Sequence, residues 1–148
     1  MLADAARVES GKLYIHGGGW DTLFVPTTPA VHPTLAVAVV LEVGWNEAFR
    51  SVQLGVDLYD EDGSLVLVGG RGMMQIGHPP DSTPGMSFLI PWQSTFNGLR
   101  FEKEGMFYFR VMVDQTELAS LRCRVTHLQM PMFPGLGGPP GPGSAQAP

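Results

Sequence analysis

The sequence is short of charge. Asp, Glu, Lys and Arg make up 16% of the residues, against about a quarter in a typical soluble domain. Basic side chains are the scarcer kind, because nine Lys and Arg stand against fourteen Asp and Glu, for a net charge of −5. Nucleic acids and anionic membranes are bound through clustered Lys and Arg. We therefore expect neither as a partner, and a surface so poor in charge suggests that a protein partner or another copy covers part of it.

Disulfides, membrane spans and leader peptides have no support in the sequence. Cys123 is the only cysteine, and it alternates in phase with Leu121 and Val125, which predicts a small buried side chain rather than a reactive thiol. The longest apolar run, residues 35–41, is too short to span a bilayer. The first ten residues lack the basic and apolar regions of a signal peptide. We expect a cytoplasmic protein.

The spacings that indicate catalytic or metal sites are also missing. No serine lies in a GxSxG elbow, and no histidine is paired with another ligand at metal-binding spacing. The acidic stretch 57–63 lacks the spacing of a calcium loop and is better explained as a hairpin turn. Arg71 among glycines is a weak candidate for holding an anion. We expect no catalytic residue, no metal site and no cofactor.

The sequence does contain many short segments of alternating polarity. In residues 105–113, Phe107, Phe109 and Val111 alternate with other residues at the period of a β-strand. A polar break over 114–117 and a second alternating segment over 121–125 predict a hairpin. Residues 9–11 likewise predict a three-residue hairpin loop between strands at 2–8 and 12–16.

Eight or nine short strands separated by turns, with almost no helical periodicity, predict an all-β antiparallel β-sandwich. An immunoglobulin- or fibronectin-like arrangement is suggested by analogy, and a closed barrel is the alternative. The further expected strands are residues 22–25, 35–43, 52–59, 64–68 with a continuation over 73–76, and 87–92, which we expect to end near Pro91. Residues 26–33 are expected to form an extended connection, residues 44–50 a loop with one helical turn, and the glycines at 69–72 a break or a bulge.

The composition changes near the C-terminus. Residues 131–148 contain six prolines, five glycines and no charged residue, a composition that cannot form a packed core. We expect one β-sandwich domain over residues 1–129 and a disordered Pro/Gly-rich tail over 130–148.

The tryptophans are the best candidates for a binding surface. Trp20, Trp45 and Trp92 are each expected at a strand end or in a loop, and tryptophan is enriched at binding hot spots. The alternative is that they plug the ends of the sandwich. The candidate binding residues are Trp20, Trp45, Asn46, Glu47, Arg50 and Trp92, with the loop from Trp45 to Arg50 as the first place to test.

Several short motifs resemble a family of short bacterial proteins, mostly actinobacterial, that is classed as a domain of unknown function. The motifs are LADAA leading into GKLY (residues 2–6 and 11–14), GGGW (17–20), EV followed by WNEA (42–43 and 45–48), and the aspartate turn at 60–63. The resemblance covers roughly residues 2–125. Gly44 stands where family members often have proline. The resemblance implies a bacterial, cytoplasmic, β-rich protein and assigns no activity.

Together these observations favour a non-catalytic protein-binding or assembly module whose partner is another protein or a second copy. The alternative is a small-molecule-binding protein or minor enzyme with a pocket near Trp20 and Trp92.

Overall fold

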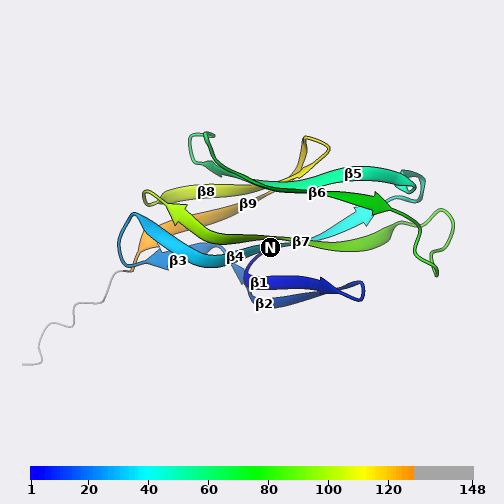
Figure 1. The fold of residues 1–148 in the computed structure, drawn as a ribbon, viewed down its shortest axis with the longest axis horizontal. Coiled ribbons are helices and arrows are strands. Elements are labelled where there is room, and N and C mark those ends of the chain that lie inside the picture. The colour runs from blue at the N-terminus through cyan, green and yellow to red at the C-terminus, as the bar shows by residue number, and fades with distance from the viewer. Residues whose placement is uncertain (129–148) are drawn as a thin grey trace, which may run out of the picture.

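The computed structural model describes residues 1–128 as two packed β-sheets (Figure 1). The all-β sandwich predicted from the sequence is confirmed, and the expected tail over 130–148 lies outside the described residues. Within residues 1–128, no helix is long and apolar enough to cross a membrane. The elements are β1 (Leu2–Glu9), β2 (Lys12–Trp20), β3 (Thr22–Val25), β4 (Ala30–Val43), the 3-10 turn η1 (Trp45–Glu47), β5 (Arg50–Asp60), β6 (Leu65–Ile76), β7 (Phe88–Phe101), β8 (Gly105–Val113) and β9 (Thr116–His127).

The four-stranded sheet has the order β2-β1-β4-β7 and the five-stranded sheet the order β3-β9-β8-β5-β6. In Figure 1, β5, β6 and β8 form the upper layer, with β4 and β7 beneath them. The prediction of an antiparallel protein is wrong at one edge, because β3 pairs with β9 in parallel. A two-residue hairpin forces its strands to be antiparallel. Strands β3 and β9 are far apart in the sequence, so no hairpin sets their direction.

Two hairpins are tighter than the sequence analysis predicted. The β1–β2 loop is Ser10-Gly11 and the β8–β9 loop is Asp114-Gln115, and all four residues have positive φ angles between 46° and 72°. Positive φ at both loop residues defines a type I′ turn, whose twist matches that of the flanking strands. Both loops therefore contain two residues, and the neighbouring positions of the expected longer loops belong to strands.

Proline does not end the strands where we expected. Strand β7 continues through Pro91, which pairs with Val40, so the predicted end near Pro91 is wrong. Strand β7 is an outer strand, and the missing N–H of a proline is tolerated where no neighbour needs it. Strand β4 likewise begins at Ala30 and includes Pro33, although we expected a connection over residues 26–33.

The glycines of β6 form a bulge rather than a break. Gly55 pairs with Arg71 and Asp57 with Val68, so one extra residue of β6 lies between these pairs. A Cβ atom on Gly69 would lie 1.8 Å from the carbonyl oxygen of Val56, which only glycine can accommodate. The strand then continues to Ile76, as predicted.

The core is made of the strand faces that alternation predicted. Both inner faces contribute to a main cluster, and a second cluster lies toward one end of the sandwich. The fully buried large side chains are Leu35, Val37, Val52, Leu54, Val56, Leu58, Phe101, Phe109, Val111, Cys123 and Val125. The second cluster contains Val43, Val52, Leu54, Ile76 and Phe88. The β1–β2 hairpin adds only Leu2 and Ala3 to the buried residues.

Candidate functional site

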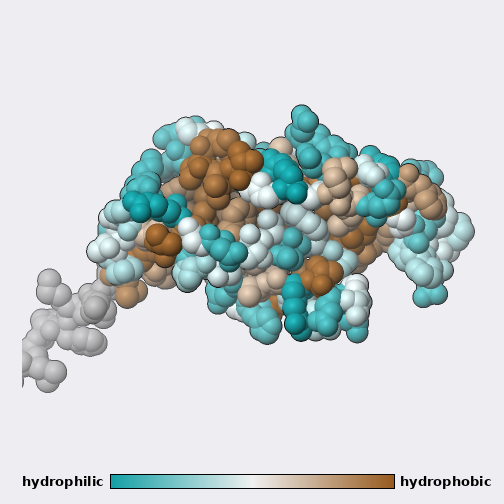
Figure 2. Space-filling model, in the orientation of Figure 1, coloured by the Kyte–Doolittle hydropathy of each residue, from teal (hydrophilic) through white to brown (hydrophobic). Residues whose placement is uncertain are grey.

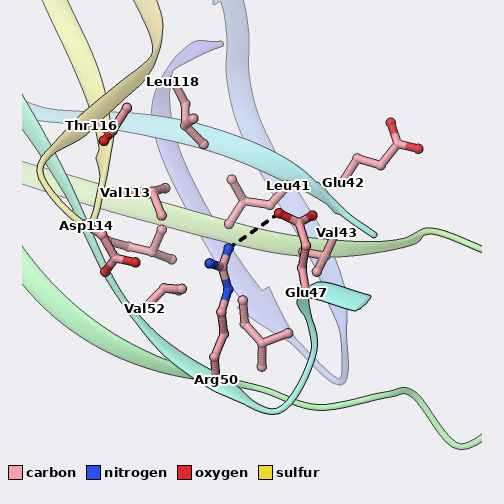
Figure 3. A pocket seen from close by; sticks show the side chains of 12 residues that line it. Leu41, Glu42, Val43, Glu47, Arg50, Val52, Val113, Asp114, Thr116 and Leu118 are labelled. Atoms are coloured by element: carbon pink, nitrogen blue, oxygen red, sulfur yellow. Dashed lines mark ion pairs between the residues drawn. The ribbon is translucent and has the colours of Figure 1, made fainter. Parts of the chain in front are cut away.

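A pocket of about 350 Å³ opens over the second core cluster at one end of the sandwich. Both sheets contribute to it, since its walls come from the end of β4, the start of β5, the end of β6 and the β8–β9 hairpin. Its apolar lining residues are Leu41, Val43, Val52, Leu54, Ile76, Val113 and Leu118, and its polar ones are Glu42, Glu47, Arg50, Asp114 and Thr116 (Figure 3). We call this site the end pocket.

The rim of the end pocket is held by a short chain of polar contacts. The Gly44 N–H donates to Oε2 of Glu47 at 2.9 Å, which caps the 3-10 turn. The other oxygen of Glu47 lies 3.5 Å from Nη2 of Arg50. Figure 3 shows these two side chains pointing toward one another beside the apolar lining. Arg50 is the first residue of β5, so this exposed ion pair links the 3-10 turn to the start of that strand.

Asp114 closes the rim on the other side. Its Oδ1 accepts from the Gln53 N–H at 2.8 Å, and its own N–H donates to the Gln53 carbonyl at 2.9 Å. These bonds tie the β8–β9 turn to β5. The carboxylates of Glu47 and Asp114 thus both accept backbone N–H groups and hold the loop and the turn in place.

An aromatic cluster lies next to the pocket. The rings of Trp45 and His78 stack with centroids 3.5 Å apart, and His78 Nε2 is 3.0 Å from the Trp45 carbonyl oxygen. Phe49 contacts His78 edge-on at 4.7 Å. The Phe49 side chain is 75% exposed and its φ angle is 59°. A bulky residue at positive φ is unusual, and here it presents an aromatic ring to solvent beside the pocket.

The six candidate residues do not form one site. Glu47 and Arg50 line the end pocket, while Trp45 packs on His78 and Asn46 is exposed on the same turn. The single helical turn expected in this loop is confirmed.

Trp20 and Trp92 lie elsewhere, and neither lines the end pocket. Trp20 ends β2, contacts His32 edge-on and donates from Nε1 to the Gly17 carbonyl at 2.8 Å. Trp92 lies inside β7 and not at a strand end, and it packs against both core clusters. Both residues pack against the core, and Trp92 does so from the middle of a strand and not from an end of the sandwich.

Sequence reasoning missed several residues of this end. The sequence analysis placed Thr116 in a predicted turn and Leu118 next to it, and it did not connect them with residues 44–50. Only the order of the strands in the sheet brings the two segments together. His78 had a weak signal, a histidine before a proline in a loop. Phe49 lies in the loop from Trp45 to Arg50 that the sequence analysis singled out, but it was not named as a candidate.

The other polar motifs have structural roles. The Asp60 carboxylate accepts from the Asp62 and Ser64 N–H groups, which confirms the hairpin turn. Arg71 donates to Oδ2 of the buried Asp57 at 2.7 Å, and this bond raises the pKa of Arg71. In residues 1–128, no three His, Cys, Asp or Glu side chains come together as a metal site.

Cys123 is buried on the core face of β9, as predicted. Burial, with the charge of Asp21 as a smaller cause, raises the pKa of its thiol to about 12. A thiol in this state is protonated at neutral pH and is a poor nucleophile.

Residues 1–126 match the model of a family of unknown function (DUF6941). No curated protein and no solved structure matches the chain. The expected membership of a domain-of-unknown-function family is confirmed at this level.

Proposed function

The chain belongs to DUF6941, a family of unknown function, and we propose that it is a non-catalytic module. The proposed module binds a protein partner at the end pocket. The observation that carries this proposal is the combination at one place of an open apolar pocket, a polar rim and an exposed aromatic ring. Protein interfaces have this composition, with an apolar centre, a polar rim and aromatic or arginine anchors. The expected occupant is an apolar side chain of the partner, with Phe49 and Leu118 packing around it.

The chemistry of the lining supports binding without catalysis. None of the twelve residues that line the end pocket is His, Cys, Lys, Ser or Tyr. Glu47 is occupied by Gly44 and Arg50, and Asp114 by Gln53.

The arginines support the expectation that nucleic acids and membranes are not partners. Six of them each lie within ion-pair distance of a carboxylate: Arg7, Arg50, Arg71, Arg100, Arg110 and Arg122. Phosphate binding needs clustered positive charge that is free to contact the ligand. A bacterial source and a cytoplasmic location belong to the same proposal and rest on the sequence.

Affinity capture of the tagged full-length chain from its native cytoplasm, with the mass of the intact complex measured, tests the proposal. We expect a stoichiometric partner that is lost from Leu118→Asp, which places a charge in the pocket wall. Val31→Asp is the matched control, because Val31 is equally exposed (59% against 58%) but lies on the other sheet. A partner retained by Leu118→Asp, or lost from both variants, would contradict the proposal.

The alternative function, a small-molecule site or minor enzyme near Trp20 and Trp92, makes a different prediction. A ligand present at 100 times its dissociation constant should stabilise the fold by about 2.7 kcal/mol. A thermal-shift screen of metals, nucleotides and acyl compounds tests it, and a hit should be lost from Trp92→Ala but kept by Leu118→Asp.

A further inference from the structure

Strand β4 has an open side next to the end pocket. On one side it pairs with β7 from end to end. On the other side β1 pairs with it only at Ala36 and Val37, and the Met1 backbone exchanges two hydrogen bonds with Ala38. In the part of the chain that the structure describes, no strand pairs with β4 beyond Ala38 on this side. Residues 39–43 therefore form an open edge of the four-stranded sheet.

The backbone groups along this edge point away from the sheet. In an antiparallel pair, successive residues direct their N–H and C=O groups alternately toward the partner strand and away from it. The N–H and C=O of Ala38 both bond Met1, so they point away from β7. Val40, two residues later, is opposite Pro91, which has no N–H to donate. Val40 and Glu42 therefore each direct an N–H and a C=O to the open side.

This edge has little of what keeps sheet edges from pairing. Soluble proteins protect their edges with charge, proline or bulges. Residues 39–43 contain one charged side chain, Glu42, and pair with β7 in an even register. A second open edge lies on β9, because β3 pairs only with its last residues. That edge is protected, since Leu118 is an extra residue in the pairing with β8 and Arg122 is charged. The β4 edge is thus the more regular and more apolar of the two.

The end pocket lies on the inner side of this open edge. Leu41 and Val43, on the inner face of β4, form one wall, and Val113 and Leu118 of the β8–β9 hairpin belong to the opposite wall (Figure 3). Successive side chains of a strand point to opposite faces of its sheet. A strand added beside β4 would therefore direct every second side chain toward the pocket, between these four residues.

Exposed apolar side chains alone do not distinguish this place. Figure 2 shows separate hydrophobic patches on the visible face of the molecule. The β4 edge differs from them because it combines a row of backbone groups with a pocket for side chains. Strand addition uses both, since main-chain hydrogen bonds provide affinity and side-chain pockets provide specificity. A bound helix satisfies its own backbone groups internally and would leave those of Val40 and Glu42 without partners.

We propose that the segment bound at the end pocket is an extended peptide of the partner protein, which adds a strand to β4 along residues 39–43. Its apolar side chains stand at alternate positions, and at least one of them occupies the pocket. This inference rests on the proposed function, because it uses the same pocket. It adds the conformation of the bound segment and the pattern of its sequence.

Selection of peptides from a random dodecapeptide phage library against the full-length chain tests this inference. We expect the selected peptides to have apolar residues at every second position, and not at the three- and four-residue spacing of a helix. Helical spacing in the selected peptides, or failure to select any peptide, overturns the proposal.

A selected peptide with a fluorescent label then tests the backbone contact by anisotropy. Val40→Pro removes an N–H from the open edge without removing a hydrogen bond to β7, and it should weaken binding about tenfold. Val40→Thr is the matched control, because it keeps the N–H at the same exposed position and should bind as the wild type does. Equal binding by the two variants overturns the proposal.

Hydrogen exchange keeps the test decisive if Val40→Pro does not fold. In the free wild-type chain, the amides of Val40 and Glu42 should exchange fast, while the amide of Leu41, which faces β7, should exchange slowly. Adding the selected peptide should slow the exchange at Val40 and Glu42. Slow exchange at both residues in the free chain, or no change when the peptide is added, overturns the proposal.

The variant Leu118→Asp separates this inference from the proposed function. If the selected peptide is lost from Leu118→Asp but kept by Val40→Pro, the end pocket binds its partner in another conformation and only the strand addition is wrong. If Leu118→Asp binds the peptide as tightly as the wild type, the pocket takes no part in binding and both proposals are wrong.

Discussion

Strands β5 and β6 are neighbours in sequence and in space, yet they are buried to very different extents. They are joined by the Asp60–Gly63 turn and pair along most of their length. Leu58 and Leu67 are direct partners across this pair, and their exposed fractions are 0% and 39%. Both strands are rich in aliphatic residues, so local composition does not explain the difference.

The difference comes from position in the sheet. Strand β5 has β8 on its other side and inner-face packing from the opposite sheet, whereas β6 is the outer strand. A central strand is covered by neighbours on both sides, while an edge strand is covered on one. The contribution of an apolar residue to the free energy of unfolding should therefore depend on the position of its strand in the sheet and not on the hydrophobicity of its side chain.

Truncating the paired leucines should show the effect of strand position on stability most strongly. Leu58→Ala removes a fully buried side chain and leaves a cavity, so we expect it to lower the free energy of unfolding by about 2–5 kcal/mol. Leu67→Ala should cost less than about 1 kcal/mol, because much of that side chain is already in water. Urea unfolding at a concentration where the chain is monomeric measures both. Equal losses would show that the edge is as well packed as the centre.

The ion pair between the two strands should give the next largest effect. Arg71→Ala leaves the buried Asp57 carboxylate with a single hydrogen bond, from the Gly69 N–H at 3.2 Å. Removing one partner from a buried pair costs about 3–5 kcal/mol, and partial exposure of Arg71 reduces the expected cost to about 2 kcal/mol. The control is Arg100→Ala, whose pair with Glu102 is exposed and should contribute little to the free energy of unfolding. Similar unfolding midpoints for the two variants would mean that Asp57 is hydrated.

The buried thiol of Cys123 on β9 should make the stability of the chain depend on pH. The ordinary thiol pKa is 9.0, and burial raises it to about 12 in the folded chain. Above pH 9 the unfolded chain loses this proton while the folded chain keeps it, so the free energy of unfolding falls as pH rises. We expect a loss of about 1 kcal/mol per pH unit between pH 9 and 12. Cys123→Val should remove this part of the slope, and an unchanged slope would assign it to other groups.

Exchanging valine for threonine should give the smallest effect at the edge. Val68→Thr replaces a methyl group that faces water and should change the stability of the monomer by less than about 0.5 kcal/mol. Val56→Thr, at a fully buried valine of the neighbouring strand β5, should cost about 1–3 kcal/mol because it buries a hydroxyl group. Thermal unfolding of the two variants side by side measures the difference. A large loss from Val68→Thr would indicate that β6 is covered even in the monomer.

Some parts of the fold can be predicted from residues that are close together in the sequence, and others cannot. Alternation identified the buried faces of β5, β8 and β9, and the polar turn residues identified the hairpins, because both depend on neighbours in the chain. The continuation of β7 through Pro91 could not be predicted in this way, since it depends on β7 being an outer strand. The site was predicted only in part, because Glu47 and Arg50 line a pocket whose other wall, at Asp114 and Leu118, comes from a segment more than sixty residues away.

The sequence by itself determined that this chain is all-β, that its turns lie at the Asp- and Gly-containing breaks, and that Cys123 faces the core, since period-two alternation and turn chemistry act over a few residues. Tertiary structure alone decided which strands lie at the edges, that β3 runs parallel to β9, that Arg71 meets Asp57, and that four distant segments enclose the end pocket. These features depend on strand order, and strand order results from burying the most apolar surface over the whole chain, which no local pattern contains.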